Sequence, residues 1–123
     1  MYYTTWRVDG EEYKLRLNTM AAVQIEKQLE MGMSEIVTHI TDTTVIVTLL
    51  WGAMQHFHHG TNMKDVCGIY DRYLDGGGDI EQMTDVLVDL LAQVGFGSKS
   101  KNAVGQKAGG QAAETFPGGL TTI

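Results

Sequence analysis

The sequence has little cysteine and little positive charge. Its single cysteine, Cys67, excludes an internal disulfide framework, and a lone thiol is typical of a protein kept in a reducing cytoplasm. Nine Lys and Arg stand against fifteen Asp and Glu, which gives a formal net charge of −6. Proteins that bind nucleic acid usually carry a basic patch, so this composition argues against nucleic acid as a partner.

Targeting segments and long uninterrupted apolar runs are also missing. The first ten residues, MYYTTWRVDG, lack the charged start and the apolar core of a secretion signal. The most apolar stretch runs from Thr43 to Gly60, but Thr48, Gly52 and Gln55 interrupt it before the roughly 20 apolar residues that a bilayer requires. We therefore expect a cytoplasmic protein that does not enter a membrane.

The stretch from Thr43 to Gly60 is instead predicted to form a buried central helix. Its apolar residues surround most of a helical wheel, and such a helix needs neighbours on most of its sides. Thr43 is expected to cap the start, and Gly60 to end the helix in a left-handed conformation just after the histidines. Trp51 is expected at the centre of the core.

A β-hairpin is predicted from Tyr2 to Leu17, around the turn-forming pair Asp9-Gly10. A two-residue loop pairs Val8 with Glu11 and, at the far end, Tyr2 with Leu17. One face then carries the hairpin's aromatic and apolar side chains: Tyr2, Thr4, Trp6, Tyr13, Leu15 and Leu17. Because two strands alone are marginal in water, this face is expected to lie on helices or on a partner, with both outer edges open for pairing.

Four further helices are predicted around the central one. The first follows Asn18 and Thr19, the second opens at Ser34, the fourth is capped by Thr61, and the fifth is capped by Asp79 and ends at Gly95. The fourth helix has an apolar stripe at three- and four-residue steps: Met63, Val66, Cys67, Tyr70 and Leu74. The predicted fold class is mainly α, with an N-terminal β-hairpin followed by a compact bundle of about five helices and a disordered C-terminal tail.

A change in composition near Phe96 predicts the domain boundary. Residues 1–96 hold six Lys or Arg and fourteen Asp or Glu, a net charge of −8, whereas residues 97–123 hold three Lys and one Glu, a net charge of +2. The second part is rich in Gly, Ala and Lys and has few large apolar residues, so it buries too little surface to offset its ordering entropy. We expect one folded domain over residues 1–96 and a flexible tail over residues 97–123.

Three patterns could carry chemistry, and each has a simpler interpretation. His56, His58 and His59 near Cys67 suggest zinc, but no second ligand pair stands at a known metal-site spacing. The segment 71–82 resembles a calcium loop but has Gln where a bidentate Glu is needed. The glycines at 76–78 suggest a phosphate loop, but such a loop follows a strand and precedes a lysine, and neither is found here. We expect no catalytic, cofactor-binding or metal-binding residues, and hence no enzyme.

Residues for protein–protein interaction are predicted in two groups. The hairpin contributes Tyr2, Thr4, Trp6 and Tyr13, whose aromatic face and open edge favour pairing with another subunit. Flexible methionines are typical of core packing and also line grooves that bind partner helices, and this second role is predicted for Met31, Met33 and Met63.

Three long phrases carry a family resemblance: EEYKLRLNTMAAVQIEKQLEMG at 11–32, VIVTLLWGAMQHFHHG at 45–60, and VCGIYDRYLDGGGDIEQMTDVLVDLLAQVGFG at 66–97. In order and spacing they resemble the tail assembly chaperones of long-tailed (siphovirus-type) phages and prophages. The resemblance covers about residues 1–97. It implies a non-enzymatic helper for virion morphogenesis that acts in the cytoplasm of the bacterial host and is absent from the mature virion.

The partners implied by the resemblance are proteins. The tape measure protein, a long helical molecule, would be bound and kept soluble, and the tail tube protein would be recruited through a frameshifted longer form where one exists. A homo-oligomer is expected as well. The alternatives are a small metal- or ligand-binding enzyme that uses His56, His58 and His59, and a regulatory adaptor or toxin–antitoxin protein with similar surfaces.

Overall fold

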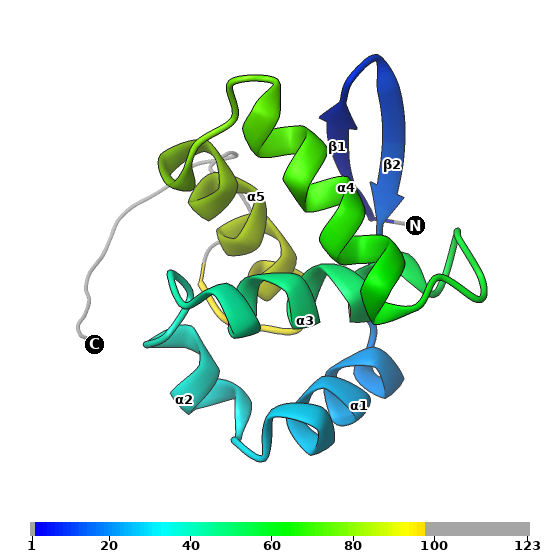
Figure 1. Ribbon diagram of the computed structural model, residues 1–123. Helices are drawn as coiled ribbons and strands as arrows, with labels where there is room; N and C mark the ends of the chain where they lie inside the picture. The colour runs from blue at the N-terminus through cyan, green and yellow to red at the C-terminus, as the bar shows by residue number, and fades with distance from the viewer. Residues whose placement is uncertain (1, 98–123) are drawn as a thin grey trace.

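The computed structural model describes residues 2–97, so the tail predicted from residue 97 onward lies outside the described residues except for Gly97. Two strands and five helices follow one another along the chain (Figure 1). They are β1 (Thr4–Val8), β2 (Glu11–Leu15), α1 (Thr19–Leu29), α2 (Met33–Val37), α3 (Thr43–Met54), α4 (Met63–Asp75) and α5 (Ile80–Gln93). This order confirms the predicted mainly α fold with an N-terminal hairpin. No helix within residues 2–97 has the length and apolar content needed to cross a membrane.

The hairpin has the predicted register over five residue pairs, from Thr4–Leu15 to Val8–Glu11. Asp9 and Gly10 both have positive φ values, of 56° and 83°, as a type I′ turn requires. The ladder is shorter than predicted because the chain leaves the sheet after Leu15. There the backbone N–H of Arg16 donates to the carbonyl of Ala53 at 2.8 Å, which joins the end of β2 to the end of α3.

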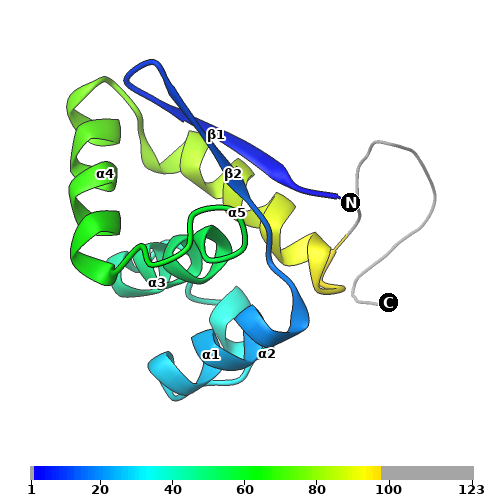
Figure 2. The same ribbon diagram turned by 90° about the vertical axis from the view of Figure 1, so that its right-hand side faces the viewer.

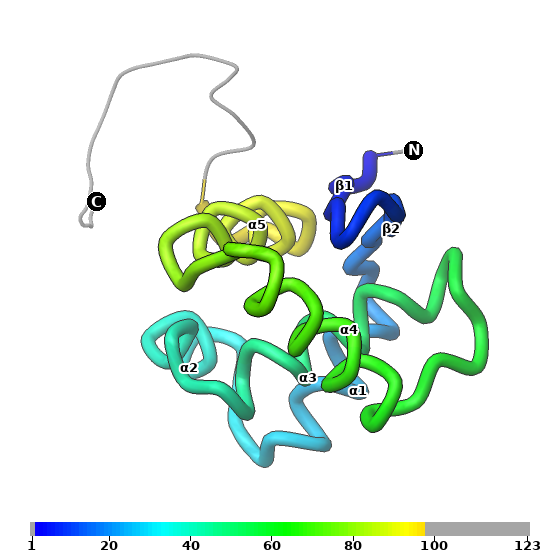
Figure 3. Tube along the Cα trace, turned by 45° about the horizontal axis from the view of Figure 1, so that its top comes forward, coloured from blue at the N-terminus to red at the C-terminus, as the bar shows by residue number. Residues whose placement is uncertain are grey.

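The two outer edges of the hairpin differ. On β2, the N–H of Lys14 donates to Nε2 of His58 at 3.2 Å, and the loop that carries His58 projects beside this strand (Figures 1 and 3). The prediction that both edges are open is therefore wrong for β2. Figure 2 shows β1 and β2 running across α5, with α4 at one side of the hairpin and α1, α2 and α3 beneath it.

Helix α3 is the central helix, as predicted, and its residues from Val45 to Leu50 are all buried. It is shorter than expected because it ends at Met54 and continues as turns to Gly60, whose φ is +81°. The histidines therefore follow the helix instead of lying in its last turn. Asp42, not Thr43, is the N-cap, and Trp51 is only partly buried at the rim of the core.

The outer helices keep their predicted order, but α4 is rotated relative to the prediction. Its buried residues are Val66, Ile69 and Tyr70, while Cys67 is exposed and Leu74 is 42% exposed. The sequence prediction that Cys67 faces the core is thus wrong. Two more predicted caps change: Gly32 replaces Ser34 before α2, and Asn62 replaces Thr61 before α4, where it forms a capping box with Asp65.

The remaining caps are confirmed. The Asn18 side chain accepts a hydrogen bond from the backbone of Ala21, and that of Asp79 accepts one from Gln82. Helix α5 buries Met83, Leu87, Leu90 and Leu91, whereas Ile80 at its start is 44% exposed, and Gly95 follows the helix with a φ of +94°. The fold thus brings the end of α5 back toward the start of the chain.

Candidate interaction surfaces

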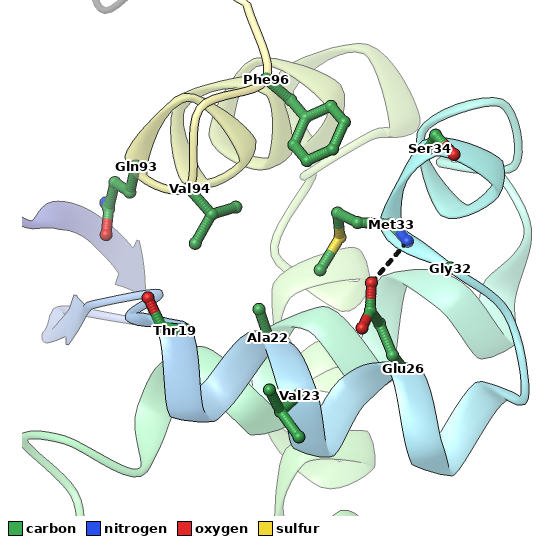
Figure 4. A pocket seen from close by; sticks show the side chains of 10 residues that line it. All are labelled: Thr19, Ala22, Val23, Glu26, Gly32, Met33, Ser34, Gln93, Val94 and Phe96. Atoms are coloured by element: carbon green, nitrogen blue, oxygen red, sulfur yellow. Dashed lines mark hydrogen bonds between the residues drawn. The ribbon is translucent and has the colours of Figure 1, made fainter.

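An apolar groove lies between α1, the start of α2 and the end of α5 (Figure 4). Its volume is about 640 Å³. The side chains of Ala22, Met33, Val94 and Phe96 turn toward the space between the helices in Figure 4. The other lining residues are Thr19, Val23, Glu26, Gly32, Ser34 and Gln93.

Local backbone geometry positions these side chains. The Glu26 carboxylate accepts a hydrogen bond from the N–H of Met33 at 2.8 Å and so fixes the start of α2 against α1. At the other wall, the N–H of Phe96 donates to the carbonyl of Leu91 at 2.9 Å, and the left-handed Gly95 turns the chain back toward the groove. The groove is therefore built from three segments that are each held by their own hydrogen bonds.

The wall of the groove on α1 is partly open to solvent. Val23 is 37% exposed, whereas Met20, which is 63% exposed, lines a different hollow beside Arg16 and His56. An amphipathic helix binds such a surface by placing apolar residues of one face into the groove. The groove offers apolar side chains of this kind, among them Val23, Val94 and Phe96.

Only one of the three predicted groove methionines lies in this groove. Met33 lines the groove but is only 5% exposed. Met31 is partly buried and does not line it. Met63 begins α4, whose residues do not line the groove either. Phe96 and Val94 were not predicted as groove residues. The signal that could have found them is the pair of apolar residues flanking Gly95, where a turn reverses the chain.

The predicted hairpin residues are used mostly inside the protein. Thr4 is 7% exposed and Trp6 is 2% exposed, because the hairpin face packs on α4 and α5. The Trp6 ring lies 5.6 Å from that of Tyr73 and 6.0 Å from that of Tyr13. Of the four predicted residues, only Tyr2, at 40% exposed, presents a large surface. The aromatic face is therefore mostly covered by the protein's own helices.

A polar network that the sequence did not reveal fixes the hairpin to α5. Gln93 accepts from the N–H of Leu17 at 2.7 Å and donates to the Thr4 hydroxyl at 2.9 Å. Asp89 accepts hydrogen bonds from the hydroxyls of Thr4 and Tyr2, both at 2.9 Å. Burial, together with the hydrogen bond to Asp89, raises the pKa of Tyr2.

The histidines do not converge on one point. His56 and His59 are exposed beside a hollow that Arg16 also lines, whereas His58 is bonded to β2. The positive guanidinium of Arg16 disfavours a second cation there. Within residues 2–97 no group of three or more His, Cys, Asp or Glu side chains is arranged to hold a metal ion.

Comparisons of the chain with protein-family models, with curated proteins and with solved structures find no match.

Proposed function

We propose that this protein is a tail assembly chaperone of a long-tailed phage or prophage. It acts without catalysis in the cytoplasm of the bacterial host, where it binds the helical tape measure protein and keeps it soluble. Several copies cover one client, and a frameshifted longer form recruits the tail tube protein. The observation that carries the proposal is the apolar groove between α1, α2 and α5, together with the family resemblance of the sequence.

The physical argument starts from the client. A long amphipathic helix exposes an apolar stripe along its length until a partner covers it. One groove of about 640 Å³ covers only a short part of such a stripe, so many copies are needed. Weak contacts repeated along one client add up to strong binding through avidity. The net charge of −6 keeps the covered client soluble by mutual repulsion of the bound copies.

The test is co-expression with the longest helical reading frame of the same phage or prophage. We expect soluble client to be recovered with many copies of this protein. Val23→Glu places a charge at the groove and should reduce recovery. Val88→Glu changes a valine on α5 that is also exposed but lies away from the groove, and it should not reduce recovery. A client that is equally soluble without this protein would contradict the proposal, and equal effects of the two variants would exclude the groove as its binding surface.

A further inference from the structure

The outer edge of β1 carries backbone groups without partners. In a two-residue hairpin the closing pair, Val8 and Glu11, exchanges hydrogen bonds, and hydrogen-bonded pairs then alternate with non-bonded ones. Thr5 and Arg7 therefore point their N–H and C=O groups away from β2. No residue within 2–97 bonds to these groups. An extended chain is the partner whose backbone matches this spacing.

A hollow of about 420 Å³ lies beside this edge. Its lining includes Trp6, Tyr73 and Val86, which together offer an apolar surface, and Gln82. Trp6 is 2% exposed, and its indole N–H has no acceptor among the described residues. A buried donor without an acceptor destabilises the protein, and a partner strand that brings an acceptor to this N–H removes that penalty.

The chemistry beside the edge is acidic. Glu81, Asp85 and Asp89 stand four residues apart on α5 and so share one side of this helix. Asp89 bonds to the hydroxyl of Thr4 in β1, which shows that this side faces the strand. Arg7, a cation that lines the hollow, is paired with Glu12 at 3.1 Å. A second copy paired through β1 would bring its own acidic stripe close to this one, whereas a basic strand would neutralise it.

We propose that β1 accepts a third strand from a partner protein. The partner strand is an extended segment whose side chains on one face, at every second residue, are a Lys or Arg, then an apolar residue, then another Lys or Arg. Its backbone pairs with Thr5 and Arg7, its apolar side chain enters the hollow against Trp6, and its cations face Asp85 and Asp89. This site lies apart from the groove of α1, α2 and α5 and does not depend on the proposed chaperone function.

The test uses the full chain labelled with ¹⁵N and a blocked probe peptide, Ser-Lys-Thr-Val-Thr-Lys-Ser, which places Lys and Val on one face of a strand. The indole signal of Trp6 is identified by its persistence in Trp51→Phe. On titration we expect this signal to move downfield as its N–H gains an acceptor. The amides of Thr5 and Arg7 should become protected from hydrogen exchange, whereas those of Trp6 and Val8 are protected already.

Two variants and a second peptide make the test specific. Thr5→Pro removes an outward N–H, which an edge strand tolerates, and should weaken binding about tenfold relative to Thr5→Val, as the loss of one hydrogen bond predicts. If Thr5→Pro does not fold, Asp85→Asn serves instead and should weaken the lysine peptide severalfold. The peptide Ser-Glu-Thr-Val-Thr-Glu-Ser should not bind.

Several results would overturn the proposal. One is a titration in which the Trp6 indole signal shows no saturable shift. Another is equal binding of the lysine peptide to Thr5→Val and to Thr5→Pro, or to the unsubstituted protein and to Asp85→Asn where that variant is used. A third is binding of the acidic peptide as tight as that of the lysine peptide. Protection of the Thr5 and Arg7 amides that rises with protein concentration in the absence of peptide would assign the edge to a second copy of the chain, and would overturn it too.

Discussion

Gly52 on α3 lies directly against Ile25 on α1, and a Cβ atom at position 52 would stand 2.6 Å from Cγ1 of Ile25. Both residues are buried, so the Ile25 side chain cannot move into solvent to make room. The close approach of α1 and α3 therefore depends on the absence of a side chain at position 52. It also explains why a glycine is found within the last turn of the most apolar helix.

Gly52→Ala should consequently destabilise the protein. Overpacking a core costs about 1–3 kcal/mol, which exceeds the roughly 1 kcal/mol that alanine gains over glycine in a helix. The matched control is Gly68→Ala on α4, where a Cβ would meet nothing within 4 Å. We expect urea unfolding to show a lower free energy of unfolding for the first variant and a higher one for the second. Stabilisation by both would contradict the tight contact.

Leu50 and Trp51 should differ in their contribution to stability. Leu50 is fully buried, whereas Trp51 lies partly exposed at the edge of the core. We expect Leu50→Ala to cost about 2–5 kcal/mol, and Trp51→Ala to cost less than the 3–5 kcal/mol typical of a fully buried tryptophan. Urea unfolding of both variants measures the difference. A larger loss for Trp51→Ala would show that the tryptophan supports the core more than its exposure suggests.

The hairpin was predictable because its determinants are local. Asp9-Gly10 fixes a two-residue turn, and the turn then fixes every pairing along the strands. The sequence could not predict where the ladder ends. That point depends on the bond from Arg16 to Ala53, a residue 37 positions away along the chain.

Helix α4 shows why the period of a pattern does not determine which face is buried. A stripe through Cys67 and Leu74 and a stripe through Ile69 and Tyr73 both have helical spacing, and both include Val66 and Tyr70. The second stripe is buried because Trp6 of the hairpin packs against Tyr73. Choosing between them requires the position of the hairpin, which the sequence of α4 does not contain.

The candidate groove was beyond sequence analysis for a similar reason. Its walls join the end of α5 to α1, which lies more than 60 residues earlier in the chain, and Met33 was the single predicted groove residue that lines it. The amphipathic pattern of α1 and α5 shows which residues are apolar. It does not show that Phe96 turns back over α1 and leaves a space between the two helices.

His58 should contribute to stability while its neighbours do not. Its Nε2 accepts the N–H of Lys14, and His56 and His59 are exposed. We expect His58→Ala to lower the free energy of unfolding by about 1 kcal/mol, the typical net value of a hydrogen bond. The double variant His56→Ala/His59→Ala should leave the melting temperature nearly unchanged. Zinc that stays bound in stoichiometric amount through dialysis would restore the metal interpretation of the histidines.

Tyr70 should make the protein less stable in alkali. Its side chain is buried beside Tyr73, with ring centroids 5.7 Å apart, and burial raises its pKa above the ordinary value of 10.0. Between the two pKa values the folded state holds a proton that the unfolded state has lost. The stability linked to Tyr70 is therefore fully present below pH 10.0 and declines as the pH rises through the folded-state pKa.

Tyr70→Phe removes this titrating group and keeps the ring. We expect equal stability of the variant and the natural sequence at pH 7, because the phenol is neutral in both the folded and the unfolded states there. Above pH 10.0 the variant should lose less free energy of unfolding, although Tyr2, Tyr13 and Tyr73, whose pKa values are also raised, still contribute to the decline. Urea unfolding at several pH values measures both slopes. Parallel slopes would mean that the Tyr70 hydroxyl remains in contact with water in the folded protein.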